Sequence, residues 1–315
     1  MRNALLSVTI AVSALLIVLL VRSNHAPPSA VATTPPPSPT VLAVRPVRFA
    51  TTAAYVSENG KDVYHDVVDY FQQKLGRPCE LVEDLSYRTV NSMLASGAID
   101  VGFICGLPYV VEADQAPPHI RIIAAPVMRA AHYENRPEYF TYLITRPGSP
   151  YTDFGSLRGC AFGYNDEYSN AGFAVPASML ADMGESLDYF GRVIRTGSHE
   201  ASIHKVAVGE VDAACVSSQI LDFDLFNNDP DARAVRIIER IGPEGAPPVV
   251  VSAKVPSELE EEIRRIFLGM HEDPRGRVIL ARSLLQRFVE VPDSNYDSIR
   301  RRRAAGERAG LLHLR

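Results

Sequence analysis

The residues best suited to chemistry in this chain are uncharged and lie at the start of an expected helix. Positions 165–173 read NDEYSNAGF, and an apolar run then extends to Gly184. Ser169 is a preferred helix N-cap, but a self-contained capping box needs Glu or Gln three residues later, where this chain has Gly172. The first-turn N–H groups therefore meet no acidic side chain, which suits an anion. An ordinary Ser-capped helix that binds nothing is the alternative.

Pro176 adds a second feature to the same helix. Proline has no backbone N–H, so the carbonyl of Gly172 loses its usual helical partner. We expect a short first turn with a bend, and this irregular start is compatible with either reading of the helix.

Catalytic and metal chemistry are poorly supported by the other reactive residues. Ser169, His199 and Asp212 could be imagined as a hydrolase triad, but the chain has no G-x-S-x-G elbow. Asp212 also opens an expected strand, so it lies at the opposite end of the sheet from the carboxyl ends of the strands, where Ser169 and His199 are expected. No Cys-x-x-Cys or Cys/His pair at metal spacing occurs. We therefore expect no catalytic residue, no metal, no cofactor and no enzymatic activity.

Length and charge limit the class of protein. The 315 residues are 46% hydrophobic, which is enough for a large core and about two domains. The net charge is -5 and the pI about 5.9, so the electrostatic footprint of a nucleic-acid-binding protein is absent. The run of four arginines at 300–303 is interpreted as the solvated face of a last helix, with a polyanion contact as the minor alternative.

The N-terminal part has the composition of an export or anchoring segment. Residues 4–21 carry no charge and are flanked by Arg2 and Arg22. We expect a signal or anchor over 1–25, a Pro-rich linker over 26–42, and a periplasmic or extracytoplasmic protein that residues 4–21 tether to the inner membrane. Cleavage near Ala32 is the alternative.

The four cysteines could form two disulfides in an exported protein. Three of them lie in or at the ends of apolar, strand-like runs, where Cys behaves as a small buried hydrophobe. We expect mostly reduced and buried thiols at Cys79, Cys105, Cys160 and Cys215.

Short β-rich runs alternate with amphipathic helices from residue 45 onward. The order strand, helix, strand, helix, strand occurs once from 47 to 106 and again from 139 to 218, and a later crossing follows at 247–255. This order predicts an α/β fold of two lobes, with parallel-rich sheets, flanking helices and a ligand cleft between the lobes. We expect lobe 1 to comprise 43–142 and 248–315, and lobe 2 to comprise 143–247.

Four motifs along the chain carry a family likeness. They read YRTVNSMLASGAIDVGFICGLPYV, SLRGCAFGYNDEYSNAGFAVPASML, GSHEASIHKVAVGEVDAA and RFVEVPDSNYDSIR. Together they resemble the phosphate/phosphite/phosphonate-binding proteins of ABC transporters, over nearly all of residues 47–300. The resemblance implies a type II periplasmic binding fold, no catalysis, and a monomer that takes a small phosphorus oxyanion and delivers it to an ABC permease in the membrane. A membrane-anchored sensing module that partners a signalling receptor would use the same site.

The resemblance also implies which residues bind the ligand. The family's anion loop falls on Ser169, Asn170, Ala171 and Gly172, where this chain lacks the family's two middle hydroxyls. Its His-Glu pair falls on His199 and Glu200, and its first-lobe aromatic on Tyr87. Ser217 stands where many members have an acidic residue, which weakens the case for an aminoalkyl phosphonate. The full expected ligand-binding set is Tyr87, Ser169, Asn170, Ala171, Gly172, His199, Glu200 and Ser217.

Each of these residues also has a structural interpretation. Glu200 could accept a hydrogen bond from a P–OH group or an amine, while its charge repels a fully ionised anion, or it could simply cap the following helix. His199 could donate to an anionic oxygen or serve a structural role, and Tyr87 could bind the ligand or be a core aromatic.

Overall fold

The structure is a computed structural model that describes residues 45–52, 56–57 and 60–314. The expected anchor over 4–21, the linker over 26–42 and the first residues of lobe 1 lie outside these ranges. Within them, no helix has both the length and the apolar content needed to cross a membrane.

The first lobe is built around a six-stranded sheet with the order β11-β4-β10-β3-β1-β2. β1 pairs in parallel with β2 and with β3, whereas β10 runs antiparallel to β3 and β4, and β11 antiparallel to β4. The strands are β1 (Val47–Thr51), β2 (Cys79–Val82), β3 (Val101–Phe103), β4 (Ile120–Met128), β10 (Val249–Ser252) and β11 (Leu285–Val289).

The second lobe is built around a five-stranded sheet with the order β7-β6-β8-β5-β9. β6 pairs in parallel with β7 and β8, and β5 runs antiparallel to β8 and β9. Its strands are β5 (Glu138–Thr145), β6 (Ala161–Tyr164), β7 (Arg192–Arg195), β8 (Ala213–Ser217) and β9 (Arg236–Gly245).

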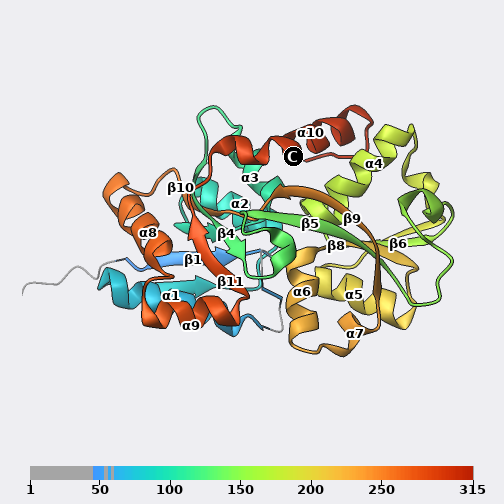
Figure 1. Cartoon of the computed structure of the whole chain (residues 1–315). Coiled ribbons are helices and arrows are strands. Elements are labelled where there is room, and N and C mark those ends of the chain that lie inside the picture. The colour runs from blue at the N-terminus through green and yellow to red at the C-terminus, as the bar shows by residue number, and fades with distance from the viewer. Residues whose placement is uncertain (1–44, 53–55, 58–59, 315) are drawn as a thin grey trace, which may run out of the picture. The chain divides into compact units, whose positions relative to one another are not determined.

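Helices flank both sheets, as Figure 1 shows for α1, α8 and α9 beside the first sheet and α4 to α7 around the second. The α-helices are α1 (Asp62–Leu75), α2 (Tyr87–Ser96), α3 (Gly106–Ala113), α4 (Val175–Met183), α5 (His199–Val208), α6 (Ser218–Phe226), α7 (Pro230–Arg233), α8 (Ser257–Gly269), α9 (Pro274–Arg282) and α10 (Asp297–Arg308). Shorter helical turns are η2 (Ala131–Tyr133), η3 (Phe154–Leu157), η4 (Asn170–Ala174), η5 (Leu187–Tyr189) and η6 (Asp293–Tyr296). The expected two-lobed α/β fold is thus confirmed.

Local sequence signals explain where the helices near the strand ends begin. The Ser86 side chain accepts the Thr89 N–H at the start of α2, and Ser198 accepts the Ala201 N–H at the start of α5. Both helices end at a glycine with positive φ, 77° at Gly97 and 81° at Gly209. These caps fix where Tyr87 and Glu200 leave the backbone, because each lies in the first turn.

Long-range pairing departs from the simple strand-helix repeat. β4 follows the first strand-helix series and pairs antiparallel with β10, and β9 follows the second series and pairs antiparallel with β5. Each sheet therefore combines parallel and antiparallel strands. β5 spans the expected lobe border at 142/143, and the whole strand belongs to the five-stranded sheet. The exact lobe borders therefore depend on sheet pairing rather than on local pattern.

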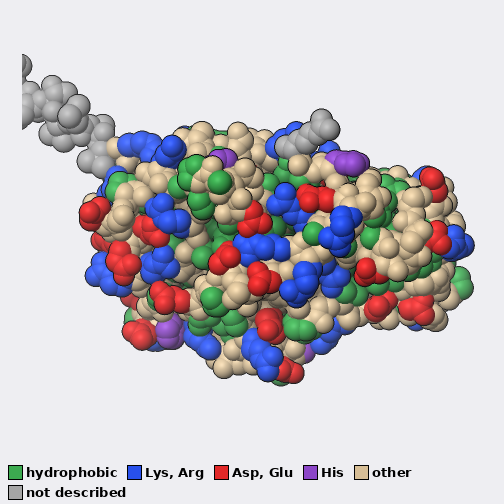
Figure 2. Space-filling view, turned by 90° about the horizontal axis from the view of Figure 1, so that it is seen from above, with side chains coloured by type: hydrophobic (Ala, Val, Ile, Leu, Met, Phe, Trp, Pro, Cys, Tyr) green, Lys and Arg blue, Asp and Glu red, His purple; other side chains and the backbone are tan. Residues whose placement is uncertain are grey.

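The arginines of α10 bind acidic side chains within the fold. Arg300 contacts Asp114 and Asp293, both at 2.8 Å, and Arg303 contacts Glu307 at 2.8 Å. Figure 2, which views the molecule from the side where α10 lies in Figure 1, shows basic and acidic side chains interspersed. Three of the four arginines of this run, Arg300, Arg302 and Arg303, are thus paired with acidic side chains of the protein itself, which disfavours a polyanion contact.

The four cysteines are free thiols, as expected. Cys105, Cys160 and Cys215 are buried, and Cys79 is half-buried. Burial raises the pKa of Cys79 to about 11 and that of Cys160 to about 12. These thiols consequently stay protonated and unreactive near neutral pH.

Candidate ligand cavity and the buried cluster behind it

A cavity of about 310 Å³ lies where strand ends of the two sheets meet. The first lobe contributes residues after β1 and β2 and from the start of α1, and the second contributes residues after β6 and β7 and from the start of α5. Ligands of open α/β sheets bind at this edge, because loops there converge from several strands. Its polar and charged lining includes Thr51, Ser57, Lys61, Tyr64, Glu83, Asp84, Ser86, Tyr87, Asp166, Arg195, Ser198 and Glu200.

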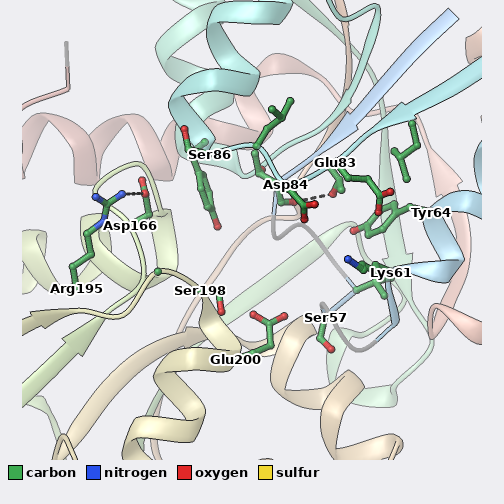
Figure 3. A pocket seen from close by; sticks show the side chains of 17 residues that line it. Ser57, Lys61, Tyr64, Glu83, Asp84, Ser86, Asp166, Arg195, Ser198 and Glu200 are labelled. Carbon is green, nitrogen blue, oxygen red and sulfur yellow. Dashed lines mark hydrogen bonds and ion pairs between the residues drawn. The ribbon is translucent and has the colours of Figure 1, made fainter.

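The cavity wall carries charges of both signs. Figure 3 shows the Glu200 carboxylate and the Lys61 amine directed into the cavity, with Asp84 on the wall opposite Glu200. Arg195 forms an ion pair with Asp166, so these two charges offset each other. Acidic side chains outnumber basic ones in the remainder of the wall, which therefore favours a ligand that brings positive charge as well as negative.

Two of the eight expected ligand residues line this cavity. Tyr87 comes from the first turn of α2, and Glu200 from the first turn of α5. The other six are buried and lie outside its lining: Ser169, Asn170, Ala171, Gly172, His199 and Ser217. The structure nevertheless brings several of them together behind Tyr87.

The helix start at Ser169 is irregular, as expected from Pro176. The N–H of Ala174 donates to the Ser169 carbonyl at 3.0 Å, five residues back, so η4 is a wide π turn. The Ser169 hydroxyl accepts the Gly172 N–H at 3.1 Å, and the Asn170 N–H donates to the Cys105 sulfur at 3.4 Å. These two N–H groups are thus bound within the protein and are not presented to the cavity.

Asn170 is directed away from the cavity, into a buried ion-pair network. Its Nδ2 donates to the Tyr139 hydroxyl at 2.7 Å and to Glu244. Glu244 is 4% exposed and is also paired with Arg302 of α10, which donates to the Ser178 hydroxyl at 3.1 Å. Asn170 therefore joins β5, β9 and α10, and this supplies a structural reason for an amide at that position.

His199 is a neutral buried ring. It is 1% exposed, and burial lowers its pKa from the ordinary 6.5 to about 3. Its Nδ1 accepts the N–H of Ser217 at 3.4 Å, so the single proton of the neutral ring lies on Nε2. His199 is consequently a neutral donor near pH 7, and Ser217 supports it through the backbone.

Tyr87 links the cavity to this buried region. It is 6% exposed, and burial raises the pKa of its phenol well above the ordinary 10.0, while a hydrogen bond with Ser169 acts in the opposite direction. The phenol therefore remains a hydrogen-bond donor at all physiological pH values.

Asn165 lies at the centre of these groups, and the sequence motifs did not single it out. Its carboxamide nitrogen is 3.3 Å from the Tyr87 hydroxyl and 3.5 Å from Nε2 of His199. A Cβ placed on Gly172 would lie 1.8 Å from Oδ1 of Asn165 and 3.2 Å from the Ser169 hydroxyl. We call Tyr87, Asn165, Ser169, Gly172 and His199 the inner cluster.

The sequence contained a signal for some of the other residues that were missed. Glu83 and Asp84 directly follow β2, so the rule that ligands bind at strand ends applies to them as it does to Tyr87. Lys61 precedes α1 and becomes part of the wall only when α1 packs on the sheet. Asn165 directly follows β6, so the same rule applied to it, but no local pattern predicted that it would lie at the centre of the buried groups.

The hydrolase alternative is not supported by the geometry. Asp212 accepts the Ala161 N–H at 2.8 Å at the start of β6, the end of the strand opposite to Asn165. Among the described residues, no group of His, Cys, Asp and Glu is arranged to hold a metal ion.

Comparison with solved structures supports the two-lobed fold. A binding protein component of an ABC phosphonate transporter from Pseudomonas aeruginosa superposes with a TM-score of 0.75 at 19% identity, covering 84% of this chain and 87% of that one. PhnD1 from Prochlorococcus marinus, in complex with methylphosphonate, gives a TM-score of 0.72 at 16% identity, covering 84% and 98%.

Sequence comparison shows the family. The phosphonates-binding periplasmic protein of Escherichia coli K12 is 21% identical over 243 residues, which are 76% of this chain and 70% of that protein. The family profile described as "ABC transporter, phosphonate, periplasmic substrate-binding protein" matches residues 49–296. The chain therefore belongs to the family of periplasmic phosphonate substrate-binding proteins of ABC transporters, which are binding components and not enzymes.

Proposed function

We propose that this chain binds a small phosphorus oxyanion, namely a phosphonate, phosphite or phosphate, in the cavity between its lobes. The observation that carries the proposal is the cavity itself, which combines Lys61 and the Tyr87 hydroxyl with carboxylates at the meeting point of the two sheets. Its volume of about 310 Å³ lies at the lower end of the range of ~300–1,000 Å³ typical of small-molecule sites, and this suits a ligand of few atoms.

A phosphonate that carries an amine fits this wall better than one without. Ser217 offers no carboxylate, which weakened this reading at the level of sequence, but Glu200 and Asp84 are placed in the cavity wall. A carboxylate can accept a hydrogen bond from an ammonium group or a P–OH group, and it repels a fully ionised oxyanion. Glu200 thus acts in this proposal as a selector for a cationic or protonated ligand group.

Calorimetric titration of the full-length chain tests the ligand. The panel is phosphate, phosphite, methylphosphonate, aminoethylphosphonate, sulfate and taurine. We expect aminoethylphosphonate to bind best, and Glu200→Gln to weaken it about ten- to a hundredfold, because one charge-assisted hydrogen bond is lost. Glu210→Gln is the matched control, since Glu210 lies beyond the end of α5, exposed and paired with Lys205. Equal affinity for taurine and aminoethylphosphonate would contradict a phosphonate-specific site.

Delivery to an ABC permease in the membrane is the second part of the proposal, and it is supported by the family to which the chain belongs. Uptake of a labelled phosphonate by cells that lack the chain should fall to background and return on complementation. Unchanged uptake, together with ligand binding by the purified protein, would favour the sensing role.

We also propose that residues 4–21 tether the protein to the membrane. The basis is the uncharged length of this segment, which lies outside the described residues. Intact-mass measurement of membrane-extracted protein should show the full chain. A soluble mature form that begins near Thr33 would exclude the tether.

A further inference from the structure

The carboxamide of Asn165 occupies the point where the donors of the inner cluster converge. Tyr87 approaches it from the first lobe at 3.3 Å, and His199 approaches it from α5 at 3.5 Å. Gly172 provides the space, because any side chain there would overlap with Oδ1 of Asn165. Four expected ligand residues, namely Tyr87, Ser169, Gly172 and His199, thus surround a side chain of the protein itself.

The hydrogen bonding of this carboxamide is incomplete. Asn165 is fully buried, and its Oδ1 accepts no hydrogen bond from the described residues. The same holds for Oδ1 of Asn170 and the hydroxyl of Ser217, the neighbours of Ser169 and His199. Unsatisfied buried oxygen atoms are costly and rare, so their concentration beside one cluster marks a place that exchanges partners.

The hydrogen-bond donors of the inner cluster indicate which kind of ligand atom it can bind. Nδ2 of Asn165 donates to the Tyr87 hydroxyl, which can itself also donate, whereas it meets the Nε2–H of neutral His199 donor to donor. The phenol and the imidazole N–H can both donate to an oxygen atom placed between them. An oxygen of a phosphonate group is an acceptor of this kind and carries negative charge.

Asn165 lies next to the cavity, because its neighbours in sequence and in space line it. The residue after it, Asp166, lines the cavity, as do Gly197, whose N–H donates to the Asn165 carbonyl at 3.1 Å, and Tyr87. The backbone of Asn165 therefore borders the cavity from which a ligand would reach the inner cluster.

We propose that Asn165 is a built-in stopper of the anion subsite. Its carboxamide takes the place of a ligand oxygen among Tyr87, Ser169, Gly172 and His199, and a bound oxyanion must displace it. The proposal deepens the proposed function and rests on it for the identity of the natural ligand. Its consequence is that this side chain lowers the affinity of the parent protein for small oxyanions and closes the polar cluster to water.

The test compares Asn165→Ala with the parent in calorimetric titrations of the full-length chain against methylphosphonate and inorganic phosphate. Removal of a competitor that hydrogen-bonds to Tyr87 should tighten binding by about tenfold. Asn91→Ala is the matched control, because Asn91 is also buried with an unpartnered Oδ1 but donates to Pro108 and Glu112 outside the cavity lining. This control should leave the affinity unchanged.

A second variant keeps the side-chain shape. Asn165→Asp retains the stopper and adds a negative charge, so binding of both oxyanions should weaken by about a hundredfold or more at neutral pH. Equal or weaker binding by Asn165→Ala would overturn the stopper, whether or not the parent binds. Failure of the parent to bind any phosphonate, with binding by Asn165→Ala, would instead overturn the proposed function of the natural chain and leave the stopper standing.

Discussion

The cavity wall and the inner cluster hold different kinds of polar group. The wall carries Lys61, Glu83, Asp84 and Glu200, whereas the cluster holds uncharged hydroxyl, amide and imidazole groups that are almost fully buried. A buried charge needs a partner, while a charge at a cavity surface keeps contact with solvent. Charged groups at the wall therefore respond to the net charge of a ligand, whereas the uncharged groups of the cluster can only offer hydrogen bonds to individual ligand atoms.

Removal of a partner from a buried charged group near the cluster should have the largest effect on the free energy of unfolding. Glu244 is buried against Asn170 and Arg302, so Arg302→Met leaves its charge without compensation and should cost about 3–5 kcal/mol of unfolding free energy. Urea unfolding measures this loss. Arg303→Met on the same helix breaks only a partly exposed pair and should cost about 0–1 kcal/mol. Similar losses for the two variants would show that burial does not separate these regions.

A methyl group added within the inner cluster should have the second-largest effect on the free energy of unfolding. Gly172→Ala places a methyl group 1.8 Å from Oδ1 of Asn165, and we expect a loss of about 1–3 kcal/mol from overpacking. Combination with Asn165→Ala should recover most of this loss, because the colliding atom is gone. Gly269→Ala is the control, since its methyl group meets nothing within 4 Å. Additive losses in the double variant would contradict the contact.

Because His199 is buried and neutral, we expect the free energy of unfolding to depend on pH. Its pKa is depressed from 6.5 to about 3, so below pH 6.5 the unfolded state binds the proton first and stability falls as pH decreases. This group should contribute up to about 1.4 kcal/mol per pH unit between about pH 6 and 4. His199→Gln should flatten the stability profile there. An unchanged slope in His199→Gln would indicate a solvated ring.

Removal of the Lys61 charge from the cavity wall should change the free energy of unfolding least. Lys61 is exposed at the start of α1, so Lys61→Met should alter unfolding free energy by no more than about 0.5 kcal/mol. Oxyanion affinity should nevertheless fall, because the cavity loses a cation. Lys74→Met, at the other end of the same helix, should leave affinity unchanged. A large loss of stability in Lys61→Met would remove the distinction between wall and cluster.

Much of the fold and some of the local geometry of the site follow from short-range sequence signals. Ser169 predicted a capped helix start, and Pro176 predicted the irregular turn that follows it. These signals act over a few residues, through hydrogen bonds and steric limits that need no distant partner. The order of motifs likewise indicated the two-lobed fold and the family.

Which polar groups face the cavity and which face one another depends on long-range packing. Asn165 lies 78 residues from Tyr87 and 34 from His199 in sequence, and its position among them depends on how the two lobes and α5 pack. The same packing buried Asn170 against Glu244 and brought Lys61 to the wall. A residue type states what a side chain can donate or accept, but burial and distant neighbours decide which partner it meets.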